Sequence, residues 1–226
     1  MNPAKLVPVV AMCSMLWTTG AAAQENAKRS KDVPKHSAAA AELKQDMRKL
    51  WTDHVVWTRD YIIAAVGDQP DAQAAAARLM KNQEDIGGAV GKFYGASAGQ
   101  QLTTLLKEHI SIAVDVIKAA KSGDKAALQQ ANTKWEQNAV AIAEFLSKAN
   151  PNWPRETLVD MMKKHLSTTT NEVVARLHKN WDEDVRAFDA VYDHILHMSD
   201  ALAEGIVKQF PDKFDGSAKS TTARAR

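Results

Sequence analysis

A short pattern that recurs three times constrains the fold of this 226-residue chain more than any other feature. His54, His109 and His165 each follow an apolar residue by four positions, and another apolar residue comes directly after each of them. The three histidines lie 55 and 56 residues apart. So regular a period predicts three copies of one helical unit, stacked against one another.

Residues 38–210 have the composition of helix throughout, since Ala, Leu, Lys, Glu and Gln are abundant and no alternating strand pattern persists. Glycine, proline and capping residues interrupt this helical stretch near residues 67–70, 94–99, 122–124, 150–154 and 180. Short connections make neighbouring helices antiparallel. We therefore predict an all-α, up-down antiparallel bundle of about six helices, built as three helical hairpins. A four-helix bundle with an added hairpin is the alternative.

The two ends of the sequence differ from this central part. Residues 1–23 combine a basic start, a short apolar run and a final Ala-Ala-Ala, which are typical of a secretory signal peptide. Residues 24–37 are polar and predict a flexible leader, and residues 211–226 predict a disordered tail. The single domain is then expected at 38–210, in a periplasmic or secreted protein without stable membrane insertion after signal cleavage.

Composition and motifs exclude several kinds of chemistry. The one cysteine, Cys13, lies in the predicted signal peptide, so the mature protein is expected to have no thiol. No Cys-x-x-Cys-His motif is present, which excludes a c-type haem. The 29 Lys and Arg nearly balance the 27 Asp and Glu, so a nucleic acid is not an expected partner. No nucleophile, phosphate-loop or dinucleotide motif assigns a catalytic residue.

The hairpin geometry predicts a polar layer in the core. Counting from each turn, the returning arms bring other polar residues to the height of the histidines or one turn further along. Imidazole, carboxylate and amide groups at one level can bind a divalent transition metal such as Zn, Cu or Fe. The candidate metal ligands are His54, His109, His165, His194, His197, Asp85, Asn82 and Asn138. Packing, hydrogen bonding, surface exposure, another ligand and pH sensing are alternative roles for the histidines.

The segment from Asn82 to Gly88 breaks the local rules for a helix. Two adjacent glycines, Gly87 and Gly88, lie in the middle of a predicted helix, where glycine lowers stability. They predict a close approach of a neighbouring helix or a kink.

Four segments of the chain resemble a family of small exported bacterial helical proteins to which no function is attached. The segments are Leu50–Arg59, Asn82–Gly87, Asn150–Trp153 and Gln209–Phe214. The resemblance covers about residues 43–214 and implies that these segments belong to one fold, but it implies no activity. Asp53-His54-x-x-Trp57 is also similar to a stretch of the zinc-binding domains of chemoreceptors.

Together these features predict an exported, soluble helical bundle that binds a small ligand or a metal ion at the histidine layer. A protein-interaction or chaperone-like module for an envelope protein, with no metal, is one alternative. A metal-dependent enzyme that uses the same layer is another.

Overall fold

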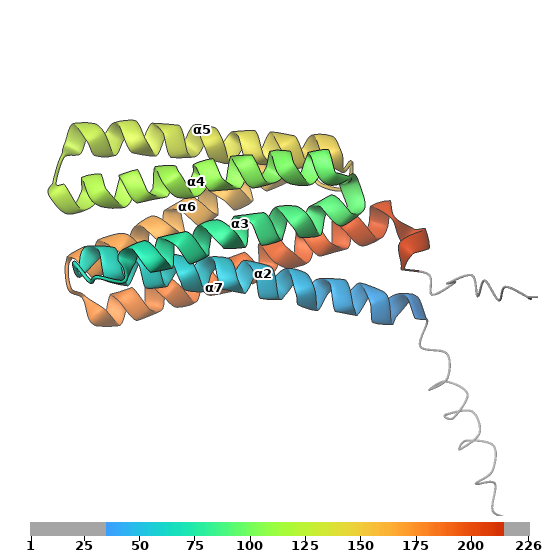
Figure 1. Ribbon diagram of the computed structural model, residues 1–226, viewed down its shortest axis with the longest axis horizontal. Coiled ribbons are helices and arrows are strands. Elements are labelled where there is room, and N and C mark those ends of the chain that lie inside the picture. The colour runs from blue at the N-terminus through green and yellow to red at the C-terminus, as the bar shows by residue number, and fades with distance from the viewer. Residues whose placement is uncertain (1–34, 215–226) are drawn as a thin grey trace, which may run out of the picture. The chain divides into compact units, whose positions relative to one another are not determined.

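The computed structural model describes residues 35–214, which form six long α-helices and a final turn of 3-10 helix (Figure 1). The elements are α2 (Lys35–Val66), α3 (Ala72–Tyr94), α4 (Ala96–Ser122), α5 (Lys125–Ala149), α6 (Arg155–Leu177), α7 (Trp181–Gln209) and η1 (Pro211–Lys213). Each helix packs on the next one in the chain, and α7 packs on α2, so the helices form a closed ring. The predicted all-α bundle is confirmed.

The helix ends lie at the predicted breaks. Gly95 and Gly123 have φ angles of 91° and 73°, a backbone conformation that side chains with a Cβ disfavour. Asp124 caps α5, because its side chain accepts a hydrogen bond from the Ala127 amide at 3.0 Å. Asn180 caps α7 in the same way, through the Glu183 amide at 3.3 Å. Connections of one to five residues therefore fold the chain back on itself.

The described helical region extends beyond the predicted domain at both ends. α2 begins at Lys35, three residues earlier than expected. Residues 211–214 do not belong to a disordered tail, because η1 follows α7 and Phe214 is buried. The Phe214 ring stacks on Phe93 of α3 at 5.9 Å, and this contact fixes the last described turn. The predicted signal peptide (1–23) lies outside the described residues.

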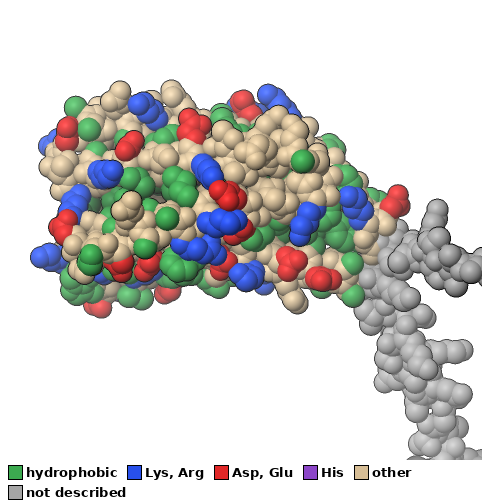
Figure 2. All heavy atoms as spheres, viewed as in Figure 1, with side chains coloured by type: hydrophobic (Ala, Val, Ile, Leu, Met, Phe, Trp, Pro, Cys, Tyr) green, Lys and Arg blue, Asp and Glu red, His purple; other side chains and the backbone are tan. Residues whose placement is uncertain are grey.

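The surface of the described region carries both signs of charge close together. On the face seen in Figure 2, basic and acidic side chains are interspersed. In the described region Lys81 and Lys107 both pair with Glu84. No helix within residues 35–214 is long and apolar enough to cross a membrane.

Glycine allows α3 and α4 to approach closely, which is one of the two outcomes predicted from the adjacent residues Gly87 and Gly88. A Cβ at Gly87 would overlap Thr103 Oγ1 and lie 2.6 Å from the Gly99 carbonyl oxygen. A Cβ at Gly99 would in turn lie 2.6 Å from the Gly87 carbonyl oxygen. Gly88 is different, because a Cβ there meets no atom within 4 Å.

Alanine at the two adjacent glycines should have opposite effects on stability. Gly87→Ala should lower the free energy of unfolding by about 1–3 kcal/mol, because the added methyl group forces the helices apart. Gly88→Ala should raise it by about 0.5–1 kcal/mol, since it only improves helix propensity. Urea unfolding followed by circular dichroism measures both. A Gly87→Ala protein as stable as the parent would contradict the close crossing.

Candidate functional site

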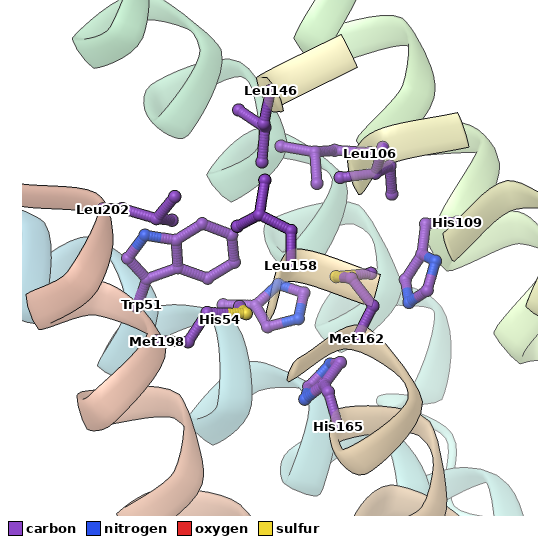
Figure 3. Close-up of a pocket in the computed structure, with 11 residues that line it drawn as sticks. Trp51, His54, Leu106, His109, Leu146, Leu158, Met162, His165, Met198 and Leu202 are labelled. Atoms are coloured by element: carbon purple, nitrogen blue, oxygen red, sulfur yellow. The ribbon is translucent and has the colours of Figure 1, made fainter. Parts of the chain in front are cut away.

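The three repeated histidines come together in the core of the bundle. His54 lies on α2, His109 on α4 and His165 on α6, and their exposed fractions are 3%, 3% and 5%. The ring centroids of His54 and His165 are 5.6 Å apart, and those of His109 and His165 are 6.2 Å apart. Figure 3 shows the three imidazoles around one region between the helices. All three imidazoles face inward, so surface exposure, one of the alternative roles considered from the sequence, does not apply to them.

A repeated hydrogen bond fixes the height of the returning arms. Asn82 Nδ2 donates to the Leu50 carbonyl at 3.0 Å, and Asn138 Nδ2 donates to the Leu105 carbonyl at 3.1 Å. His194 Nε2 donates to the Met161 carbonyl at 2.8 Å in the third hairpin. Each carbonyl lies four residues before the histidine of its own hairpin. The three hairpins are therefore built alike, and the predicted register is correct.

Both ring nitrogens of His109 are occupied. Its Nδ1–H donates to Asn138 Oδ1 at 2.8 Å, and its Nε2 accepts from the indole Nε1–H of Trp135 at 3.0 Å. Trp can only donate, so this pattern assigns the proton of the neutral ring to Nδ1. The lone pair of Nε2 is the one that a metal ion would need.

His54 has one partner, the side-chain amide of Gln83. Gln83 Nε2 lies 3.3 Å from His54 Nδ1 and also donates to the Leu79 carbonyl at 2.8 Å. Gln83 Oε1 is buried and has no hydrogen-bond partner within the described residues. The second ring nitrogen of His54 makes no hydrogen bond there either.

His165 is the least satisfied of the three histidines. Its Nδ1 is buried without a hydrogen-bond partner in residues 35–214, and its Nε2 makes no hydrogen bond in this part of the chain. The nearest ring besides those of His54 and His109 is that of His194, with centroids 6.4 Å apart. Buried polar atoms are seldom left unpaired in proteins, so this imidazole needs an explanation beyond packing.

Burial keeps the three imidazoles neutral at physiological pH. Loss of solvation lowers the pKa of His54 from 6.5 to about 3, and the neighbouring His109 adds to the shift. Loss of solvation likewise lowers the pKa of His109 to about 4 and that of His165 well below its usual value. A neutral imidazole keeps one nitrogen lone pair, which is the form that binds metals.

Two small cavities flank the histidine layer. One, of about 20 Å³, is lined by Trp51 of α2 and by apolar side chains of α4, α5, α6 and α7. The other, of about 80 Å³, is lined by residues that follow the histidines, among them Thr58 and Thr169. All three histidines line both cavities. The first cavity has room for one water molecule or one ion, and the second has room for a few water molecules.

Two of the predicted ligands lie away from this layer. Asp85 is on the surface, where its carboxylate pairs with Lys81 at 2.7 Å. His197 is exposed and its Nδ1 lies 2.7 Å from the Asp193 carbonyl. Asn82, Asn138 and His194 do reach the layer, but their side-chain N–H groups donate hydrogen bonds to the backbone carbonyls of Leu50, Leu105 and Met161. As placed, no three His, Cys, Asp or Glu side chains of residues 35–214 converge closely enough to hold a metal ion.

Several residues at the layer were not among the predicted ligands. Gln83 is adjacent to a predicted ligand, Trp135 is one of six tryptophans, and two methionines, Met162 and Met198, line the smaller cavity. Helical spacing offered a signal for the methionines. Met162 precedes His165 by three residues and Met198 follows His194 by four, so each shares a face with its histidine.

A second buried polar cluster lies beyond the layer, between α2, α6 and α7. Arg59 donates to Glu172 at 2.8 Å and to both carboxylate oxygens of Asp184 at 3.1 Å. Arg176 also pairs with Asp184, at 3.1 Å. Burial raises the pKa of Glu172 to about 7, although Arg59 acts in the opposite direction. The carboxylates of this cluster are therefore held by arginines and are not directed at the histidines.

Comparison of the chain with protein-family models, with curated proteins and with solved structures finds no match.

Proposed function

We propose that this protein is an exported helical bundle that takes up one transition-metal ion between His54, His109 and His165. The observation that carries the proposal is the convergence of three buried, neutral imidazoles, one of which has no hydrogen-bond partner. Core histidines that serve only packing are expected to have both nitrogens satisfied or exposed. The unpartnered Nδ1 of His165 is therefore available to a water molecule or an ion in the adjoining cavities.

Two of the three ring separations, both to His165, are compatible with a shared ion. Two imidazoles bound to one zinc ion in tetrahedral geometry place their centroids about 5 Å apart, since each Zn–N bond is about 2.0–2.1 Å. The observed separations of 5.6 and 6.2 Å exceed this value only slightly. Binding by all three histidines requires the rings to move, because as placed in residues 35–214 they do not converge closely enough to hold an ion.

Binding also requires two partners of the histidines to change their hydrogen bonds. Trp135 must release His109 Nε2, while Asn138 continues to accept from Nδ1–H and keeps the ring oriented. The Gln83 amide must turn so that its unpartnered Oε1 accepts from Nδ1–H of His54, which frees the Nε2 lone pair. Such partners orient metal-bound histidines in many proteins.

Metal analysis of the untagged protein tests the proposal. The protein is loaded without oxygen with Zn²⁺, Cu⁺ or Fe²⁺, separated from unbound ions, and analysed for metal by mass spectrometry. We expect one ion per chain and its loss when His54, His109 and His165 are all replaced by alanine. His165→Leu, which keeps most of the side-chain volume, provides a second variant if the triple one does not fold. His197→Ala is the matched control and should bind normally. A stoichiometry near zero for every ion, or one unchanged in both variants, would refute the site.

Export is tested separately by cell fractionation. We expect the mature protein in the periplasm or the medium, beginning after residue 23, as mass spectrometry of the intact chain would reveal. Retention of residues 1–23 on a cytoplasmic protein would contradict this part of the proposal.

A protein-interaction module is the second candidate, and two exposed apolar side chains favour it. Trp181 and Val185 are 53% and 55% exposed and lie four residues apart on α7, so they share a face. Crosslinking in the periplasm through a photoreactive amino acid at position 185 would test for a bound envelope protein.

A further inference from the structure

The smaller cavity beside the histidines offers an unusual set of donor atoms. Apart from the three imidazoles, its lining consists of two thioethers, one indole and aliphatic side chains. Met162 comes from α6 and Met198 from α7, with exposed fractions of 6% and 3%. Figure 3 shows both sulfur atoms in the region of His54, His109 and His165. No carboxylate, hydroxyl or side-chain amide lines this cavity.

The donor set favours a soft metal ion. Thioether sulfur is a soft ligand that selects Cu(I), whereas hard cations such as Mg²⁺ and Ca²⁺ require oxygen ligands. Imidazole binds copper, zinc, iron and nickel alike and so does not decide between them. The two methionines are therefore the ligands that would favour Cu(I) over zinc, iron and nickel.

The charge of the surroundings points the same way. Neither imidazole nor thioether brings a negative charge as a ligand, and the buried carboxylates of Glu172 and Asp184 are already paired with Arg59 and Arg176. An ion in the cavity would thus have no anionic ligand. The cost of moving an ion out of water rises with the square of its charge, so a divalent ion pays about four times the penalty of a monovalent one.

We infer that the ion is Cu(I), held by histidine nitrogens together with the sulfur of Met162, Met198 or both. The inference rests on the proposed function, because it names the ion that the same histidine layer takes up. It involves no redox step, since the protein binds and releases copper in the monovalent state. The larger cavity, with the hydroxyls of Thr58 and Thr169, lies on the other side of the layer and takes no part in binding.

Competition with a colorimetric Cu(I) chelator, bicinchoninate, measures the affinity under anaerobic conditions, and a zinc indicator measures Zn²⁺ in parallel. Replacing Met162 and Met198 together by leucine, which nearly conserves volume, should weaken Cu(I) binding at least tenfold and leave Zn²⁺ binding unchanged. Met47→Leu is the matched control, because Met47 is as deeply buried but does not line this cavity. Thr169→Val should also leave Cu(I) binding unchanged.

X-ray absorption of the copper-loaded parent protein keeps the test valid even if the double variant does not fold. We expect sulfur among the nearest neighbours of the metal. The inference is overturned if only nitrogen and oxygen are found, if the double variant binds Cu(I) as tightly as the parent, or if Zn²⁺ binds more tightly than Cu(I). In each of these cases a histidine-dependent ion still upholds the proposed function, whereas the absence of any such ion refutes both.

Discussion

Lowering the pH from 7 to 5 should destabilise the metal-free protein by about 4 kcal/mol, which is a large part of the stability of an ordinary domain. The unfolded chain binds protons at histidine near pH 6.5, whereas burial lowers the pKa of His54 to about 3 and that of His109 to about 4 in the folded protein. The pKa of His165 is lowered as well. Between pH 7 and 5 these histidines therefore bind protons in the unfolded state but not in the folded state, which favours unfolding.

The sign follows for each group. A histidine with a lowered pKa contributes stability above pH 6.5 that is lost as the pH falls, by about 1.4 kcal/mol per pH unit. Glu172 acts in the opposite direction, because its folded pKa of about 7 lies above its ordinary value of 4.5. It gains stability as the pH falls through this range and offsets about one of the three histidines. The net slope between pH 6 and 5 should be about 2–3 kcal/mol per pH unit.

Urea unfolding at pH 7.5, 6.0 and 5.0, in the presence of a metal chelator, measures this slope. His165→Leu should reduce it by about one proton, and His178→Ala, at an exposed position, should leave it nearly unchanged. A parent protein whose stability is the same at pH 7.5 and 5.0 would show that the histidines are not buried as neutral rings.

Much of the fold could be predicted because its determinants are local. Gly95, Gly123 and the capping residues Asp124 and Asn180 end or start helices through bonds to nearby residues. The repeat then supplied the register, since equal arms bring equal positions to one height. His54, His109 and His165 were found in the same way.

The errors at the site have a geometric cause. A residue three positions along a helix is rotated by about 60° from the first, and one four positions along by about 40° to the other side. Asp85 and His197 lie three positions after Asn82 and His194 and turn outward, whereas Met198 lies four positions after His194 and turns inward. Asp85 and His197 were assigned to the layer from their position along the helix axis alone, without regard to the direction in which their side chains point.

Contacts between distant segments left no local pattern to read. Gln83 and its neighbour Asn82 are both buried because α3 packs between α2 and α4. The sequence pattern of a helix with a single buried face does not predict that two consecutive amide side chains are buried. Arg59 meets Glu172 and Asp184 across more than a hundred residues of sequence. Their pairing depends on how the first and third hairpins close the ring.

Removing the guanidinium of that cluster should be among the most damaging single changes in the protein. Arg59→Leu is expected to lower the free energy of unfolding by about 3–5 kcal/mol, because Glu172 and Asp184 would keep their burial and lose the cation that both of them contact. The Glu172 and Asp184 side chains are only 1% and 3% exposed, so water cannot replace the lost hydrogen bonds. Arg176 remains beside Asp184 and limits the loss.

The pH dependence of this loss separates charge from packing. Without Arg59 the pKa of Glu172 should rise further, so Glu172 would be protonated and neutral in the folded variant at pH 5.5. At pH 8 the unfolded chain carries this carboxylate ionised in water, whereas the folded variant must bury it either as an unpaired charge or as a protonated acid, and both are costly. The loss should therefore be smaller at pH 5.5 than at pH 8 in urea unfolding experiments. Arg48→Leu is the matched control, since Arg48 makes a two-bond pair with Asp200 at the surface, where solvent screens it, and should cause only a small change. If Arg59→Leu behaved like Arg48→Leu at both pH values, the ion pairs of Arg59 with Glu172 and Asp184 would contribute little to the stability of the protein.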